Sequence, residues 1–139
     1  MLVVDTPILS ELMRPDPILR VLDWFNAIPA SEMYVTPITE AEIRIGLAYL
    51  PDSARRRRML ESIERLFDRF FAGRILTFDR PATRILAEFA AIRRSIGRPL
   101  PFADGQIAAI ARTHDMIVAT RNVKDFDGLQ LQIVNPWEN

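Results

Sequence analysis

Acidic side chains stand where short apolar runs of the sequence meet segments with helical spacing. Asp5 directly follows the aliphatic run at residues 2–4, Glu40 and Glu42 come soon after a second run, and Asp104 opens a helical segment before a later run. If the runs are parallel strands, these acids gather beyond the carboxyl ends of the strands, where such sheets bind ligands. Oxygen ligands of this kind suit Mg²⁺ or Mn²⁺. Such an ion polarises a phosphate and generates hydroxide from water, so the predicted chemistry is metal-assisted phosphodiester hydrolysis.

Polar residues at the end of the run at residues 116–120 are directed to the same edge. Thr120 ends this run, and Arg121 and Asn122 follow it. Arg121 is a candidate to hold a phosphate, because a guanidinium group suits bidentate contacts with phosphate oxygens. Thr6 and Thr120 are candidates to position water or a phosphate, although threonine hydroxyls in turns often bond only to nearby backbone. We therefore expect Thr6, Thr120 and Arg121 to contact substrate.

Each acid also has a purely structural interpretation. An aspartate between a strand and a helix is commonly a helix cap, but the threonine and proline after Asp5 already supply a cap and a first turn. Glu42 fits a capping box with Thr39, three residues earlier. Asp104 suits the positive end of a helix dipole, although the glycine that follows it is unfavourable inside a first turn. The convergence of these acids on one edge favours function.

The order of elements predicts a single three-layer α/β domain over residues 1–139. Helical spacing, prolines and caps predict helices near 6–12, 18–28, 42–50, 53–72, 81–96 and 103–113, the second opened by an Asp16–Pro17 cap. Apolar runs at 2–4, 33–36, 75–78, 116–120 and 131–134 predict strands. Because these strands are unbroken aliphatic runs separated by helices, we expect a parallel sheet covered on both faces.

Composition excludes several classes of protein. The chain has 139 residues, no cysteine, and 18 basic against 18 acidic residues. Disulfides and thiolate metal sites are excluded, and a cytoplasmic location is expected. No apolar run approaches the roughly 18 residues of a membrane-spanning helix. Zero formal charge removes the simplest argument for a nucleic-acid binder, a strong positive excess.

Several segments together resemble a known family. They are DTPILSEL, ITEAEIRIGLAYLP, FAGRILTFD, GRPLPFADGQIAAIA, VATRNVKDF and the closing NPW. In this order they resemble the PIN-domain ribonucleases, specifically the VapC toxins of bacterial type II toxin–antitoxin modules. The resemblance implies a three-layer α/β fold with a parallel sheet of about five strands. It also implies a Mg²⁺- or Mn²⁺-dependent endoribonuclease that a cognate VapB-type antitoxin inhibits, and it favours a homodimer.

The resemblance also assigns residues to the site. Asp5, Glu42 and Asp104 match the three acids of the family, so they are the implied metal ligands, and Glu42 is preferred to the glutamate two residues before it. Asn122 falls where many relatives have a fourth aspartate, so we expect it to support the catalytic acids through hydrogen bonds. Pro7 replaces an asparagine that is common in the family. Because Asn122 is neutral and lowers the negative charge of the pocket, one ion is expected and a second is in doubt.

Two other features leave alternatives open. The run at residues 55–58 consists of four arginines. It fits either a contact for RNA phosphates or an acidic partner, or a solvated helix face neutralised by the pairs Arg57–Glu61 and Glu61–Arg65. His114 is the only histidine, which excludes an acid–base pair of histidines, and we expect it to cap a helix end near solvent.

The predicted function is therefore that of a toxin that hydrolyses single-stranded or looped RNA. A rival interpretation is a catalytically silent module that only binds its antitoxin, because Pro7 and Asn122 depart from the family pattern. A phosphatase or phospho-receiver of the same sheet class fits less well. The former needs an aspartate at the position of Pro7, and the latter, with Asp79 as phosphoacceptor, lacks a lysine before Lys124.

Overall fold

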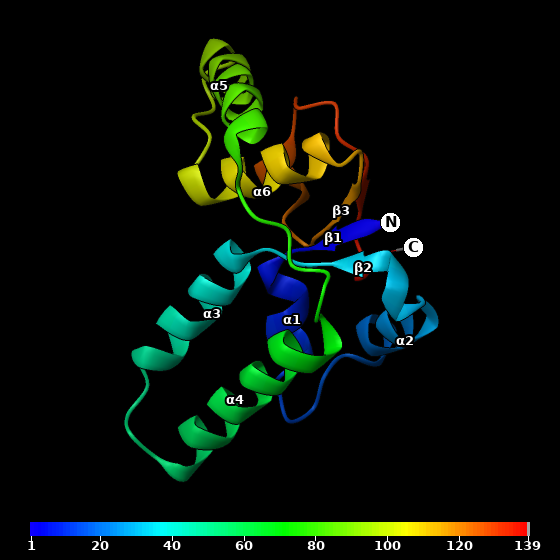
Figure 1. The fold of residues 1–139 in the computed structure, drawn as a ribbon, viewed down its shortest axis with the longest axis vertical. Coiled ribbons are helices and arrows are strands. Elements are labelled where there is room, and N and C mark those ends of the chain that lie inside the picture. Colours follow the sequence, from blue (N-terminus) through cyan, green and yellow to red (C-terminus); the bar gives the residue numbers. More distant parts are fainter. Residues whose placement is uncertain (139) are drawn as a thin grey trace.

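The computed structural model describes residues 1–138, and Asn139, the last residue of the predicted domain, lies outside the described residues. The elements are β1 (Leu2–Val4), α1 (Thr6–Leu12), α2 (Leu19–Ala27), η1 (Ala30–Glu32), β2 (Met33–Tyr34), α3 (Pro37–Ala48), α4 (Ala54–Arg65), η2 (Leu66–Phe70), α5 (Arg80–Ser95), α6 (Phe102–Thr113), β3 (Ile117–Ala119), η3 (Val123–Phe126) and β4 (Ile133–Val134). In Figure 1 the sheet lies between α5 and α6 on one side and the first four helices on the other. The predicted three-layer α/β architecture is confirmed. No helix in residues 1–138 is long and apolar enough to cross a membrane.

The sheet is parallel throughout, with the order β2-β1-β3-β4. The central strand β1 places Val3 opposite Tyr34 on one side and Val118 on the other. The sheet has four strands where about five were expected, because residues 75–78 contribute only one bridge, between Ile75 and Val35. This segment crosses from the α4 side of the sheet to α5 (Figure 1), so it leaves the sheet after a single pairing.

Side-chain caps explain where several helices begin. Thr36 accepts a hydrogen bond from the backbone N–H of Thr39 and caps α3, while Ser53 and Asp79 cap α4 and α5 in the same way. The helix predicted from residue 42 therefore starts earlier. The expected capping box between Thr39 and Glu42 was wrong, because Glu42 lies in the second turn of α3.

The buried acid Glu11 organises the connection between α1 and α2. Its side chain is 5% exposed. It accepts hydrogen bonds from the backbone N–H of Ile18 at 3.2 Å and from Arg14 Nη1 at 3.2 Å. The helix α2 begins after Ile18, so the predicted Asp16–Pro17 cap was wrong. A carboxylate from the preceding helix takes over the capping of this N-terminus.

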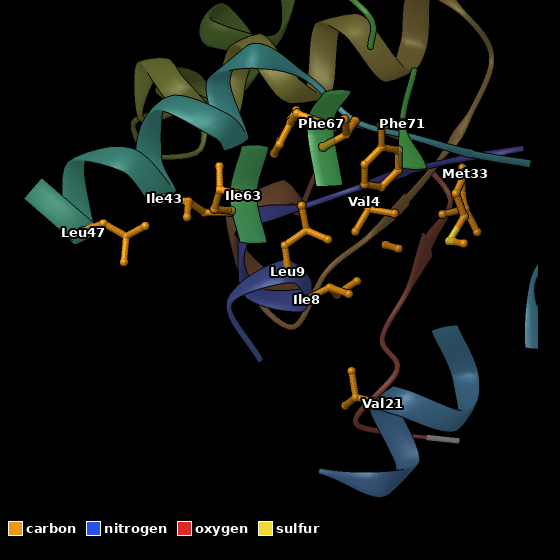
Figure 2. Packing of buried hydrophobic residues seen from close by; sticks show 13 residues of the cluster. Val4, Ile8, Leu9, Val21, Met33, Ile43, Leu47, Ile63, Phe67 and Phe71 are labelled. Atoms are coloured by element: carbon orange, nitrogen blue, oxygen red, sulfur yellow. The ribbon is translucent and has the colours of Figure 1, made fainter. Parts of the chain in front are cut away.

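Alternate residues of the strands supply two hydrophobic clusters, one on each face of the sheet. Val4 and Ala119 belong to the first cluster, with side chains from α1 to α4 and η2. Figure 2 shows Val4 among the side chains of this cluster, close to Phe71 and Leu9. Val3 and Val118 belong to the second cluster, with α5 and α6. Since successive strand side chains point to opposite faces, β1 and β3 are buried from both sides. This fixes the sheet edge at which Asp5 and Thr120 emerge.

The contact between α5 and α6 depends on the small residue Gly105. A Cβ atom placed on Gly105 would lie 2.4 Å from Leu86 Cδ1 and 3.1 Å from Leu100 Cδ2. These distances are below van der Waals contact, so a larger residue at position 105 would require the side chains of Leu86 and Leu100 to shift. The glycine beside Asp104 therefore has a packing role, and it sets the position of that turn.

Candidate active site

Asp5 is a buried carboxylate at the carboxyl end of β1. Its backbone N–H donates to the carbonyl of Ala119 at 2.9 Å, and its Oδ2 accepts from the hydroxyl of Thr120 at 2.7 Å. Asp5 occupies the N-cap position of α1, but its side chain makes no capping hydrogen bond and is 4% exposed. Burial raises the pKa of Asp5 to about 6, although the bonds from Thr120 and the backbone of Thr6 lower it.

Glu42 reaches the site from α3 and is exposed. Its Oε1 accepts a hydrogen bond from the hydroxyl of Thr6 at 2.7 Å, and the Thr6 hydroxyl lies 3.1 Å from the hydroxyl of the buried Thr39. Thr6 directly follows Asp5, so this short network joins Glu42 to the segment that carries the first acid. Neutral hydroxyl groups thus orient Glu42 without compensating its charge.

The neighbouring glutamate, Glu40, is occupied elsewhere. Its Oε2 accepts from Nε and Nη2 of Arg44 at 2.9 and 2.7 Å, and Nη2 also pairs with Glu64 on α4 at 2.7 Å. This ion-pair network connects α3 with α4. Glu40 is therefore engaged in a structural contact, which agrees with the preference for Glu42 as the site residue.

Asp104 lies half-buried in the first turn of α6. Its pKa is raised to about 6, first by burial and then by the negative charges of Asp125, Asp5 and Glu42, while Arg93 acts in the opposite direction. The same charges of Glu42 and Asp125 also raise the pKa of Asp5. The acids predicted from distant parts of the sequence are thus close enough to repel one another.

Asn122 enters the site through its backbone. Its N–H donates to the hydroxyl of Thr120 at 3.0 Å, whereas its side chain is exposed and makes no capping bond to η3. The acid that the turn brings toward the site is Asp125, whose charge acts on both Asp5 and Asp104. The sequence indicated at most an assisting role for Asp125, which lies near Asn122 in the chain, because nothing in its spacing required a place in the site. The signal was its position in the turn after a strand that supplies other site residues.

The predicted substrate-binding residues divide into two groups. The hydroxyls of Thr6 and Thr120 bond directly to the carboxylates of Glu42 and Asp5. Arg121 is exposed, and its guanidinium carbon lies 5.3 Å from the ring centroid of Trp137. This stacking arrangement leaves the guanidinium at the surface.

The carboxylates have the chemistry of a site for a hard divalent ion. Within residues 1–138 there is no ready-made group of three acidic or histidine side chains around a common point. The raised pKa values of Asp5 and Asp104 nevertheless mean that negative charge there is poorly compensated. Oxygen-only donors under this repulsion suit Mg²⁺ or Mn²⁺. The residues present fit such an ion, which Asp5, Glu42 and Asp104 would hold.

The arginine run lies at the start of α4 and divides between two surroundings. Arg57 pairs with Asp52 at 3.2 Å. Within residues 1–138, the pair between Arg57 and Glu61 that the sequence suggested does not form. Arg55 and Arg58 line a groove of about 680 Å³ between α1 and α4, together with Ser10, Met13, Arg14, Pro15, Met59 and Ser62. The run is therefore partly neutralised and partly presented to a groove.

The fold and the acidic edge define the class of protein. The PIN domain family matches residues 2–129, which include all the acids described above. The chain therefore belongs to the PIN-domain family, and the predicted resemblance is confirmed.

Particular relatives sharpen this assignment. The chain is 36% identical over 139 residues to "Toxin FitB" of Neisseria gonorrhoeae, covering all of both chains. It is 40% identical over 138 residues to "VapC ribonuclease Y4jK" of Sinorhizobium fredii, covering 99% of each chain. Its fold matches the structure of FitAB bound to IR36 DNA fragment with a TM-score of 0.93 and 37% identity, covering 100% of this chain and 97% of that one.

Proposed function

We propose that this protein is the toxin of a toxin–antitoxin pair and acts as a Mg²⁺- or Mn²⁺-dependent endoribonuclease, with residues 1–139 forming one domain. The observation that carries this proposal is the pair Asp5 and Asp104. Each is buried enough, and near enough to other carboxylates, to have a pKa of about 6. Strongly perturbed carboxylates that converge on one sheet edge are typical of functional sites. The ribonuclease and toxin names of the similar proteins support the same activity.

The acids take different parts in hydrolysis. Asp5 and Asp104 hold the ion, and Glu42 either joins them or orients and deprotonates the attacking water, because it is exposed and free of ion pairs among residues 1–138. When bound, the ion supplies Lewis-acid polarisation of the phosphate and lowers the pKa of water. Thr120 and Thr6 keep Asp5 and Glu42 in orientation through their hydroxyls.

The surroundings of the acids suit an RNA substrate and a protein inhibitor. Arg121, at the surface after β3, is placed to contact a substrate phosphate, and single-stranded RNA would leave its phosphates accessible. Asn122 supports the site through the hydrogen bond from its backbone N–H to Thr120.

A VapB-type antitoxin would present a basic side chain to the acids, because the acids are negatively charged and a basic side chain would compensate that charge. The similarity to FitB, solved as FitAB on DNA, supports such a partner. RNA as substrate implies a cytoplasmic location, and we expect a homodimer.

The decisive experiment measures cleavage of a labelled single-stranded RNA pool by the metal-free, partner-free protein. Addition of Mn²⁺ or Mg²⁺ should start cleavage, EDTA should stop it, and Asp104→Ala should abolish it. Asp23→Asn changes an exposed aspartate on α2, so it is a matched control that should cleave at the wild-type rate. Cleavage that survives Asp104→Ala would come from a contaminant and would contradict the proposal.

The alternative function is a catalytically silent PIN module that only binds its antitoxin. The exposed, neutral side chain of Asn122 and the proline at the start of α1 favour it, because the pocket lacks two groups that are common in the family. The same assay separates the two functions. A protein that binds Mn²⁺ and an antitoxin but leaves every RNA intact would establish the silent module.

A further inference from the structure

The site described so far does not account for Arg93, near the end of α5. Its side chain is 4% exposed, which is rare for a charged residue. It donates from Nε to the carbonyl of Arg98 at 2.8 Å and from Nη1 to the carbonyl of Asp125 at 2.6 Å. Burying a cation against neutral carbonyls is unfavourable unless something else compensates it. A nonpolar residue would serve packing at least as well, so a role beyond packing has to be sought.

The two carbonyls belong to the segments that carry acids on this side of the sheet. Arg98 lies in the connection that leads from α5 into α6, the helix of Asp104. Its own backbone N–H returns to the carbonyl of Arg93 at 2.9 Å, which closes the connection. The second carbonyl belongs to Asp125 itself, in η3. One guanidinium group therefore fixes the backbone on the way to Asp104 and at Asp125.

The opposite end of the η3 turn is fixed to Asp5. The N–H of Asn122 donates to the Thr120 hydroxyl at 3.0 Å, and that hydroxyl donates to Asp5 at 2.7 Å. Within the turn, the N–H of Asp125 returns to the carbonyl of Asn122 at 3.0 Å. The turn is thus held between the first acid and Arg93, and Asp125 is the acidic residue on this span.

We propose that Arg93 is a positioning residue whose two backbone hydrogen bonds hold the turn of Asp125, and the connection that leads to Asp104, beside the acidic site. The inference rests on the proposed function, since it concerns the binding of a divalent ion by these acids. The charge of Arg93 also lowers the pKa of Asp104, although burial and the neighbouring carboxylates raise it more. The hydrogen bond from Arg93 to the carbonyl of Asp125 keeps this acid near the ion site. Arg93 itself does not contact the ion, and it acts only through Asp125 and Asp104.

The test is the affinity of the metal-free, full-length protein for Mn²⁺ without RNA, measured by electron paramagnetic resonance of the free ion. Asp125→Asn keeps the backbone carbonyl but removes the charge. Arg93→Met removes the hydrogen bonds to the carbonyls of Arg98 and Asp125. Each should weaken Mn²⁺ binding about 10-fold or more, as loss of groups that orient a metal site generally does. Arg93→Lys keeps the charge but only part of the hydrogen bonding, so its loss should be smaller. Arg94→Met, an exposed neighbour on α5, should bind like the wild type.

The double variant Arg93→Met/Asp125→Asn separates positioning from general damage. If Arg93 acts mainly through Asp125, adding the second substitution should change little. The affinity of the double variant for Mn²⁺ should be at most about threefold lower than that of the single variant with the lower affinity. Multiplied effects, or unchanged affinity in a folded Arg93→Met, would overturn the inference. If Arg93→Met does not fold, unchanged affinity in both Asp125→Asn and Arg93→Lys would overturn it. Failure of the wild type to bind Mn²⁺ would instead refute the proposed function, and the inference with it.

Discussion

The two sides of the acidic site are built in different ways. On the α3 side, Glu42 is exposed and is held by the neutral hydroxyl of Thr6. On the α6 side, Asp104 is half-buried, repelled by Asp125 and compensated by the buried Arg93. Asp5, between them, is buried and has a raised pKa. The difference teaches that this fold buries carboxylates near other carboxylates on one side of the site and leaves the carboxylate on the other side exposed to solvent.

The largest effect should follow from removing the central charge. Asp5→Asn keeps the shape of the side chain and an oxygen that can accept from Thr120, but it removes a proposed ligand of the ion. We expect Mn²⁺-supported RNA cleavage to fall by at least about 100-fold, the size typical of losing one electrostatic contributor at an active site. Initial rates on a labelled RNA measure this, with Asp23→Asn as control. A loss of less than threefold would contradict the assigned role of Asp5.

The burial of Asp5 should appear as a pH dependence of stability in the metal-free protein. Asp5 has a pKa of about 6 in the folded chain against 3.8 ordinarily, so the folded state binds its proton more tightly. Stability from this group is therefore present below about pH 4 and is lost as pH rises through about 6. Relative to Asp5→Asn, the wild type should lose on the order of 2 kcal/mol of unfolding free energy between pH 4 and pH 8.

Urea unfolding in EDTA at a series of pH values measures this difference. Saturating Mn²⁺ at pH 8 should restore the wild type and leave Asp5→Asn nearly unchanged, because the ion compensates the charge that burial disfavours. Parallel stability curves for the two proteins would mean that burial does not perturb Asp5. The comparison between the buried and the hydrated sides of the site would then fail.

A smaller contrast should separate the two threonine hydroxyls. Thr120→Val removes a buried bond to a charged carboxylate, and Thr6→Val removes a bond to an exposed one. Hydrogen bonds to charged groups contribute about 1.5–3 kcal/mol, and less where water can replace the donor. We expect kcat/KM to fall about 10-fold for Thr120→Val and about threefold for Thr6→Val. Thr113→Val, whose hydroxyl bonds only to the carbonyl of Ala109, is the control, and a reversed order would contradict the contrast.

The smallest contrast concerns the effect on stability of replacing one glycine on the α6 side and one on the α3 side of the site. Gly105→Ala should destabilise the protein by about 1–3 kcal/mol, because its Cβ would overlap the end of the Leu86 side chain and force that side chain to shift. Gly46→Ala, on α3, has no atom within 4 Å of the new Cβ and should stabilise by about 0.5–1 kcal/mol. Thermal unfolding of the metal-free variants measures both changes. Two changes of the same sign would show that packing at the α6 side is looser than the distances indicate.

Much of the fold follows from local patterns. Aliphatic runs such as residues 2–4 predicted the central strands, because a strand buried on both faces must be apolar throughout. Helix boundaries were less predictable where a distant side chain provides the cap. Glu11 caps α2 from the preceding helix, and Thr36 starts α3 before the apolar spacing becomes regular. Residues 75–78 have the composition of a strand, but the path of the chain allows them a single bridge.

The site was predictable to the extent that its residues follow strands or open helices. Asp5, Glu42 and Asp104 could be proposed because parallel strands bring their carboxyl ends to one edge, and the family resemblance preferred Glu42 to Glu40. Asp125 could be noticed only as a neighbour in sequence, since the hydrogen bond from Arg93 that fixes its turn is a tertiary contact. Asn122 was assigned a side-chain role, whereas the structure uses its backbone N–H. Sequence position identified the segment, but it did not identify which atoms of the segment reach the site.

The sequence by itself determined the α/β class and the parallel strands, and it predicted Asp5, Glu42 and Asp104 as candidate site acids, because hydrophobic periodicity and residue type are local properties of the chain. Only the tertiary structure decided how deeply each acid is buried and which neighbours its charge reaches. A pKa depends on desolvation and on distances between groups as remote in sequence as Asp5 and Thr120, which are 115 residues apart. Those quantities exist only once both faces of the sheet are packed.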